Sequence, residues 1–173
     1  MESHAAQWLF FLKFPAHFLL PNLPRTKVED ERAEPKRLLI VDDDETVTAS
    51  LASLLGSDPV VVRTASSWEQ AVELLQSETF DLVITDLRLS GRVGMEGLDL
   101  ISQIKQRSPG TRVVLLTAYG SPEIEREARA RGADDYWEKT LPVSALLERA
   151  RALGLRTRSE KNQPISPAGE AVN

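Results

Sequence analysis

The sequence predicts one α/β domain in which a parallel sheet lies between two layers of helices. Short apolar segments alternate with segments whose apolar residues recur at helical spacing, from residue 37 to about residue 155. Residues 82–85 have no polar face, which is typical of a strand buried on both sides of a parallel sheet. Repeated strand–helix units of this kind fold with right-handed crossovers and with helices on both faces of the sheet.

The predicted strands share an apolar run that is followed by a polar side chain. The first run ends at consecutive aspartates, and the third ends at Asp86. Valine, leucine and isoleucine predominate in them, as expected of strands in a parallel sheet. The predicted strands are residues 37–41, 59–64, 82–85, 112–116 and 135–138.

The predicted helices carry apolar residues on one face and begin at capping residues. Gly56 closes the first helix, and a serine at position 66 or 67 caps the second. Ser121-Pro122 is a strong start for the fourth. The predicted helices are residues 45–55, 67–76, 98–106, 122–131 and 142–153.

A domain of this size favours the flavodoxin-like fold, a (βα)5 three-layer sandwich with the parallel sheet order 2-1-3-4-5. In that order the first and third strands are neighbours, at the point where the strand order reverses. Ligands of such sheets bind outside the carboxyl ends of the strands at this point. Side chains that follow the first and third strands are therefore expected to share one pocket.

The composition excludes several classes of protein. With 42% hydrophobic and 27% charged residues, the 173-residue chain has the composition of a soluble globular protein. A net charge of -5 predicts no nucleic-acid partner. The chain has no cysteine, which excludes disulfides, thiolate metal sites and cysteine nucleophiles. His4 and His17 both precede the predicted domain, which therefore has no imidazole for acid–base chemistry or metal binding.

Residues 1–36 differ from the rest of the chain. Residues 8–20 are rich in aromatic side chains but too short to span a bilayer, and Lys13 and Pro15 interrupt them. The start lacks the cationic region and the cleavage site of a signal peptide. We expect a flexible extension and charged linker without stable membrane insertion, together with a start assigned too early. A weak membrane or partner anchor is the alternative. Residues 156–173 are expected to be a disordered tail.

Polar side chains follow each strand that borders the predicted pocket. Singly they have ordinary explanations, since aspartate caps helices and turns, threonine closes turns and lysine lies on surfaces. A helix cap explains only one of the three consecutive aspartates, however. Polar side chains also follow four of the strands, which is more than these separate explanations predict. Converging carboxylates repel each other unless a cation lies among them, and oxygen ligands alone favour a partly hydrated Mg²⁺. The side chains are Asp42, Asp43, Asp44, Asp86, Thr117 and Lys139.

Four short motifs resemble the receiver domain of two-component response regulators. The resemblance covers residues 37–155 and agrees in order, spacing and strand context. Because residues 156–173 are too few to fold into a DNA-binding or enzymatic domain, we expect a single-domain response regulator. The motifs are Val41-Asp42-Asp43-Asp44, Ile84-Thr85-Asp86, Leu116-Thr117-Ala118 and Asp135-Tyr136-Trp137-Glu138-Lys139.

The resemblance implies a phosphoacceptor and a metal site. Asp86 would accept a phosphoryl group from a histidine kinase or a histidine phosphotransfer protein. Asp43 and Asp86 would bind Mg²⁺ directly, and Asp42 would bind it through water. The backbone carbonyl of Arg88 would be a further ligand.

The resemblance also implies how the signal leaves the pocket. Lys139 would pair with Asp86 and then with the phosphoryl oxygens, and the Thr117 hydroxyl would hydrogen-bond the phosphoryl group. Tyr136 would be the aromatic residue that turns inward on activation. We expect a cytoplasmic protein that acts through protein contacts on a target that the sequence does not identify, with homodimerisation on phosphorylation as one route. The expected chemistry is Mg²⁺-dependent self-phosphorylation and autodephosphorylation, without other enzymatic activity.

Two departures from the family lie near the pocket. Thr140 follows Lys139 where receivers usually have proline, and the loop of residues 87–96 is longer than usual, with Ser90 where proline is common. Neither departure removes a group that the chemistry needs. The first mildly favours the alternative of a phosphorylation-independent interaction module. A Mg²⁺-dependent phosphohydrolase is a weaker alternative, because Arg88 stands where such enzymes usually carry a second aspartate.

Overall fold

The computed structural model describes residues 34–57, 59–89 and 94–155. Most of the predicted N-terminal extension and the whole predicted tail, residues 156–173, lie outside the described residues. In the described ranges no helix is long and apolar enough to cross a membrane.

Strands and helices alternate along the described chain, and all strand pairs are parallel. The strands are β1 (Lys36–Val41), β2 (Val60–Ala65), β3 (Leu82–Asp86), β4 (Arg112–Thr117) and β5 (Asp135–Glu138). The helices are α2 (Glu45–Leu55), α3 (Trp68–Ser77), α4 (Glu96–Arg107), α5 (Pro122–Ala130) and α6 (Val143–Ala152). The sheet order is β2-β1-β3-β4-β5, which confirms the predicted flavodoxin-like topology.

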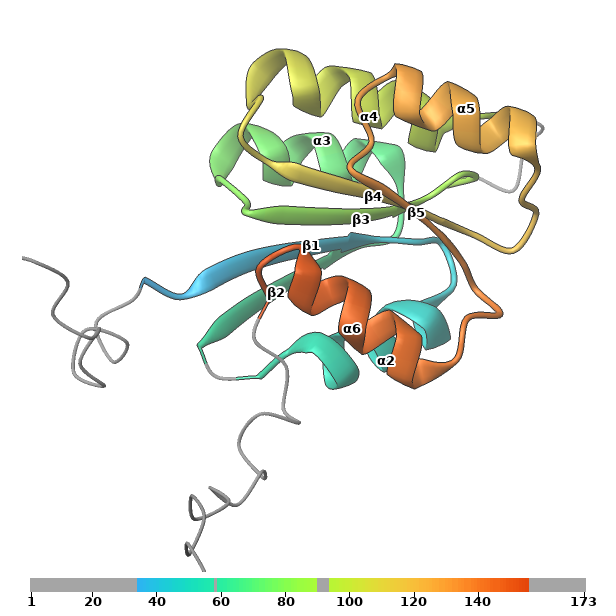
Figure 1. The fold of residues 1–173 in the computed structure, drawn as a ribbon. Coiled ribbons are helices and arrows are strands. Elements are labelled where there is room, and N and C mark those ends of the chain that lie inside the picture. The colour runs from blue at the N-terminus through green and yellow to red at the C-terminus, as the bar shows by residue number, and fades with distance from the viewer. Residues whose placement is uncertain (1–33, 58, 90–93, 156–173) are drawn as a thin grey trace, which may run out of the picture. The chain divides into compact units, whose positions relative to one another are not determined.

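Helices cover both faces of the sheet. Figure 1 shows α3, α4 and α5 on one face and α2 and α6 on the other. All residues of β3 are buried, and successive apolar side chains of this strand contribute to the two cores alternately. Leu82 and Ile84 belong to the core beneath α2 and α6, whereas Val83 belongs to the core beneath α3 to α5. The polar end of this central strand is therefore held between two packed layers.

Side-chain caps mark the starts of α2, α3 and α5. The Asp44 side chain accepts a hydrogen bond from the Thr46 N–H at 2.8 Å and caps α2, so Asp42 and Asp43 remain for other roles. Helix α4 begins at Glu96, two residues before the predicted start at residue 98. The cause is a close approach at Gly97, whose N–H donates to the Leu87 carbonyl at 3.1 Å.

Candidate phosphorylation site

The predicted site residues meet at the carboxyl ends of the strands. Asp42 and Asp43 follow β1, Asp86 ends β3, Thr117 ends β4 and Lys139 follows β5. Because β1 and β3 are adjacent in the sheet, the residues that follow them are brought together at the point where the strand order reverses.

Three carboxylates form a cluster with one open side. Asp42, Asp43 and Asp86 each offer an oxygen that lies within 4.8 Å of the others. Asp42 is 1% exposed and Asp86 8%, whereas Asp43 is exposed. Backbone amides hold two of the oxygens: Asp42 Oδ1 accepts from the Asp44 N–H at 3.0 Å and Asp86 Oδ2 from the Arg88 N–H at 3.3 Å.

The cluster fits a hard divalent cation. Asp86 Oδ1 is buried and accepts no hydrogen bond from the described residues, although the Lys139 ammonium lies 3.6 Å from it. Three clustered carboxylates carry more negative charge than one ammonium offsets, and buried anionic oxygens are costly without a compensating cation. Carboxylate oxygens are the ligands that Mg²⁺ prefers, and the exposed side at Asp43 leaves room for the waters that Mg²⁺ retains. The residues present can therefore hold the ion that the sequence implies.

Lys139 brings a positive charge into the cluster. Its Nζ lies 2.7 Å from Asp42 Oδ2 and 3.6 Å from Asp86 Oδ1. Burial alone would lower the pKa of Lys139, but its close contact with Asp42 and the charge of Asp86 outweigh burial and raise it. Burial raises the pKa of the Asp86 carboxyl, Lys139 opposes this shift, and the neighbouring Asp42 charge adds to it. Asp86 is thus more basic than an ordinary aspartate, which favours nucleophilic attack.

The Thr117 hydroxyl can donate into the pocket. Thr117 is 1% exposed, and its Oγ1 accepts a hydrogen bond from the Tyr119 N–H at 3.1 Å. Asp86 pairs with Leu116 in the β3–β4 register, so Thr117 lies one residue beyond the level of the nucleophile. Because the hydroxyl oxygen is occupied as an acceptor, its proton is available to a group bound on Asp86.

The Lys139 backbone is held without the usual proline. The Lys139 N–H donates to the Thr117 carbonyl at 2.9 Å and continues the pairing of β4 with β5. The Leu141 N–H donates to the Glu138 carbonyl at 3.0 Å, which closes a turn around the exposed Thr140. This departure from the family therefore leaves the lysine within reach of both carboxylates. The other departure, at Ser90, lies outside the described residues.

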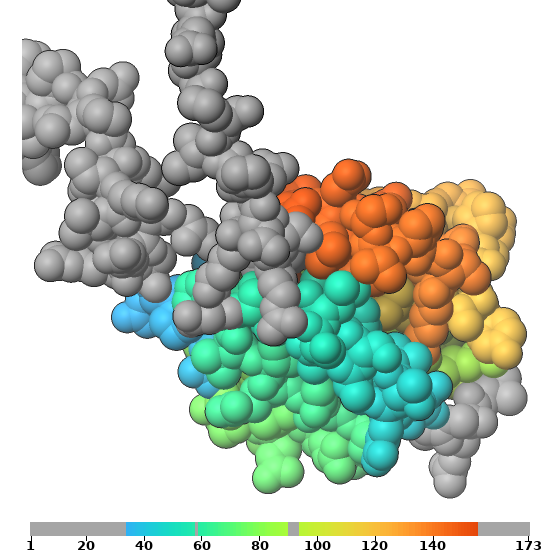
Figure 2. Space-filling model, turned by 90° about the horizontal axis from the view of Figure 1, so that it is seen from below, coloured from blue at the N-terminus to red at the C-terminus, as the bar shows by residue number. Residues whose placement is uncertain are grey.

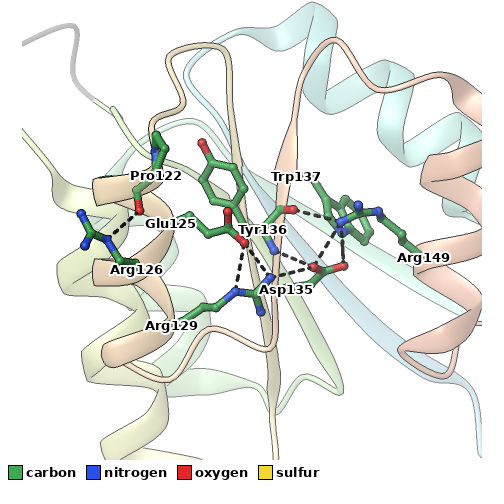
Figure 3. Close-up of polar contacts among 8 residues, drawn as sticks. All are labelled: Pro122, Glu125, Arg126, Arg129, Asp135, Tyr136, Trp137 and Arg149. Atoms are coloured by element: carbon green, nitrogen blue, oxygen red, sulfur yellow. Dashed lines mark hydrogen bonds and ion pairs between the residues drawn. The ribbon is translucent and has the colours of Figure 1, made fainter.

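Tyr136 lies inside the domain. Its side chain is 8% exposed, and Figure 3 shows the ring on the side of β5 that faces α5. A Cβ added at Gly120 would lie 2.0 Å from the Tyr136 hydroxyl oxygen, so the loop after β4 needs glycine there to admit the ring. Burial raises the pKa of Tyr136, and the charges of Glu138 and Glu125 raise it further.

Asp135 ties β5 to helices on both faces of the sheet, and sequence reasoning gave it no role. Its carboxylate accepts from the Trp137 indole N–H at 2.6 Å and pairs with Arg149 of α6 at 3.2 Å (Figure 3). Arg129 of α5 approaches the same carboxylate at 3.6 Å. Arg149 also donates to the Tyr136 carbonyl at 3.1 Å, so the position of this strand depends on both helices.

A groove beside Lys139 was also missed by sequence reasoning. It encloses about 300 Å³ and lies between α2 and α6, which are neighbours on the face seen in Figure 2. The helical spacing of Val47, Leu51 and Leu54 was the available signal, because these residues share a face of α2 that α6 covers only in part. Its lining is mainly apolar and includes Val47, Leu51, Leu54, Leu141, Val143 and Leu146.

Comparison with known proteins agrees with this geometry. The family model for the response regulator receiver domain matches residues 38–151. The response regulator protein PilR of Pseudomonas aeruginosa is 38% identical over 131 residues, which is 75% of this chain and 29% of PilR. The DNA-binding transcriptional regulator NtrC of Klebsiella pneumoniae is 31% identical over 137 residues, which is 77% of this chain and 29% of NtrC. The chain thus spans less than a third of these curated relatives.

Solved structures show the same fold. A CheY-like receiver domain protein from Methanospirillum hungatei is 30% identical with a TM-score of 0.62, and the match covers 68% of this chain and 91% of that one. A response regulator from Burkholderia pseudomallei, solved with a phosphorylated aspartic acid, a calcium ion and citrate, is 27% identical with a TM-score of 0.59. That match covers 76% of this chain and 77% of the other. The chain belongs to the family of response regulator receiver domains.

Proposed function

We propose that this domain accepts a phosphoryl group on Asp86 from a phosphohistidine in the cytoplasm and passes the signal on by protein contact. The donor would be a histidine kinase or a histidine phosphotransfer protein. The observation that carries this proposal is the position of Lys139, whose ammonium lies within 3.6 Å of Asp86 and within 2.7 Å of Asp42. The phosphorylated aspartic acid in the related Burkholderia protein supports it by analogy.

In the transfer, an Asp86 oxygen forms a bond to phosphorus as the phosphorus–nitrogen bond of the donor breaks. The bonding pair returns to the histidine nitrogen, so the phosphoryl group moves without an external reactant. Such a transfer asks the protein mainly for positioning and for neutralised charge on the transferred oxygens. Lys139 supplies one positive charge, and the Thr117 hydroxyl donates a hydrogen bond to a phosphoryl oxygen.

Four residues would hold the metal ion. Asp43 and Asp86 would bind it directly, Asp42 through water, and Arg88 through its backbone carbonyl. A Mg²⁺ ion held there would neutralise charge on the phosphoryl group during transfer. The cluster of three carboxylates, whose charge the Lys139 ammonium offsets only in part, supports a further cation at this position.

The groove between α2 and α6 would receive a helix of the phosphodonor. Lys139 both lines this groove and contacts Asp42 and Asp86, so a helix seated there has its side chains next to the nucleophile. Val143, which is 57% exposed at one wall, would lose its contact with water on docking. Val143→Asp should therefore slow transfer from a histidine donor that reacts with the wild type, while phosphorylation by acetyl phosphate stays unchanged. Equal loss with both donors would contradict this docking mode.

The central test is phosphorylation of the full chain by acetyl phosphate with Mg²⁺, followed by intact mass. We expect wild type to gain one hydroxylamine-sensitive phosphoryl group and Asp86→Asn to gain none. Asp44→Asn is the matched control, because asparagine caps a helix as well as aspartate and this residue lies outside the carboxylate cluster. Wild type that gains no phosphate, or Asp86→Asn that still does, would contradict the proposed function.

A further inference from the structure

Helix α5 has little apolar packing. Ala128 is the only residue between Pro122 and Ala130 that is buried, and Ile124 is partly buried against the same core. The neighbouring helix α4 buries Gly97, Leu98, Leu100, Ile101 and Ile104. Figure 1 shows the two helices side by side on one face of the sheet. Because burial of apolar surface holds a helix in place, α5 can change its position at a lower cost than α4.

An ion pair joins the C-terminal end of α5 to α4. Arg131 caps α5 and donates to Asp99 Oδ1 of α4 at 2.6 Å and to Glu127 Oε1 of its own helix at 2.7 Å. Gly132 follows with a φ of 101°, and a Cβ there would lie 2.9 Å from Lys105 Cγ of α4. The chain thus passes close to α4 at this point, and the pair connects a firmly packed helix to a lightly packed one.

The other end of α5 is connected to the phosphorylation site by a short turn. Residues 118–120 are exposed and separate Thr117 from Ser121, which caps the start of α5. Under the proposed function the Thr117 hydroxyl donates to a phosphoryl oxygen on Asp86. A shift of Thr117 towards that oxygen would pull on this turn and on the first turn of α5. Because the ion pair holds the opposite end, any displacement of the whole helix must stretch or break the pair.

We propose that the Asp99–Arg131 pair restrains α5 in the unphosphorylated domain and is lost when a phosphoryl group occupies the pocket. Its strength then sets how readily the domain changes to its phosphorylated conformation. This inference rests on the proposed function. The Asp99 side chain is 69% exposed and the Arg131 side chain 32%, and pairs this exposed shift an equilibrium by up to about fivefold. Because the pair stabilises one of two states, its removal should raise the affinity for a ligand that selects the other by the same factor.

The test measures binding of beryllofluoride, a phosphoryl mimic, to the full chain with Mg²⁺ at low salt by isothermal titration calorimetry. We expect Asp99→Asn to bind the mimic about two- to fivefold more tightly than wild type. Asp99→Glu keeps the charge that Arg131 requires and should bind like wild type. Arg126→Gln is the matched control, because Arg126 pairs with Glu123 within α5 and that pair moves with the helix. The difference between wild type and Asp99→Asn should disappear in about 1 M NaCl, which screens exposed charges.

Urea unfolding separates a restraint on one state from a contact that is present in both. Asp99→Asn should lower the stability of the free domain more than that of the domain saturated with Mg²⁺ and beryllofluoride. Equal losses with and without the mimic, or an affinity of Asp99→Asn no higher than that of wild type, overturn the inference and leave the proposed function intact. A wild type that gains no phosphate from acetyl phosphate overturns the proposed function and this inference with it.

Discussion

Lys139→Met should strongly lower the free energy of unfolding of the metal-free domain. The change removes an ammonium from among carboxylates and leaves a side chain of similar length. At an effective dielectric constant of about 20, charges 2.7 and 3.6 Å apart attract by roughly 6 and 5 kcal/mol. The ammonium is partly buried and has lost part of its hydration, so the net loss is smaller than this sum. Removing one partner of a buried ion pair typically costs about 3–5 kcal/mol, which we expect here. Native domains are stable by about 5–15 kcal/mol, so the variant should retain only a small part of its stability or unfold.

The loss should be largely reversed by Mg²⁺, because a bound cation restores positive charge beside Asp42 and Asp86. The assay is urea unfolding followed by far-UV circular dichroism at neutral pH, with either EDTA or Mg²⁺. Lys105→Met is the matched control, because Lys105 of α4 forms a partly buried 2.7 Å pair with Asp134, which lies near the starts of β4 and β5 and away from the carboxylate cluster. Lys105→Met should be less stable than wild type, and Mg²⁺ should increase its stability by no more than it increases that of wild type. A Lys139→Met domain as stable as wild type in EDTA, or equal rescue of both variants by Mg²⁺, would refute the reasoning.

Three further changes have clear expected outcomes. The raised pKa of Asp86 means that its contribution to stability is present in acid and is lost as pH rises through that pKa. Asp86→Asn should therefore be more stable than wild type at neutral pH without Mg²⁺, and urea unfolding should show the difference vanish in acid. Thr117→Val should slow phosphorylation by acetyl phosphate about 10- to 150-fold, the value of a charge-assisted hydrogen bond, as initial rates would show. Gly97→Ala should lower both the stability and the Mg²⁺ affinity of the domain, because its Cβ would lie 2.1 Å from the Asp86 carbonyl oxygen. Gly110→Ala is the control and should change neither quantity, because the space around its Cβ is open. Urea unfolding and Mg²⁺ titration measure the two effects.

The features that depend on local pattern could be predicted from the sequence. The unbroken apolar run before Asp86 predicted a strand buried on both faces, and β3 is such a strand. The three aspartates after β1 predicted one helix cap and left two for another role, and the resemblance to the family assigned that role to Asp42 and Asp43. The choice of Asp44 as the cap depends on backbone geometry, since its side chain must reach the Thr46 N–H.

Features that depend on distant contacts could not be predicted in the same way. The glycine-rich stretch before residue 98 predicts a loop, whereas α4 begins two residues earlier, at Glu96, and Gly97 packs closely against the end of β3. The ion pair of Asp99 with Arg131 joins two helices through residues 32 positions apart, and no local spacing reports such a pair. The groove is a different case: the helical spacing predicts an apolar face on α2, but only the packing of α6 beside α2 decides how much of that face stays uncovered.

The contacts that Asp135 and Arg149 make with each other and with the backbone of β5 have a consequence for self-association. β5 is the last strand of the sheet, and an uncovered last strand offers its amides and carbonyls to another chain. Here the Tyr136 N–H donates to Asp135 Oδ1 at 2.8 Å and the Tyr136 carbonyl accepts from Arg149 at 3.1 Å. These groups are already satisfied, so two copies gain little by extending one sheet into the other. A dimer on this side of the domain is expected to form by helix packing and to dissociate without disturbing the strands.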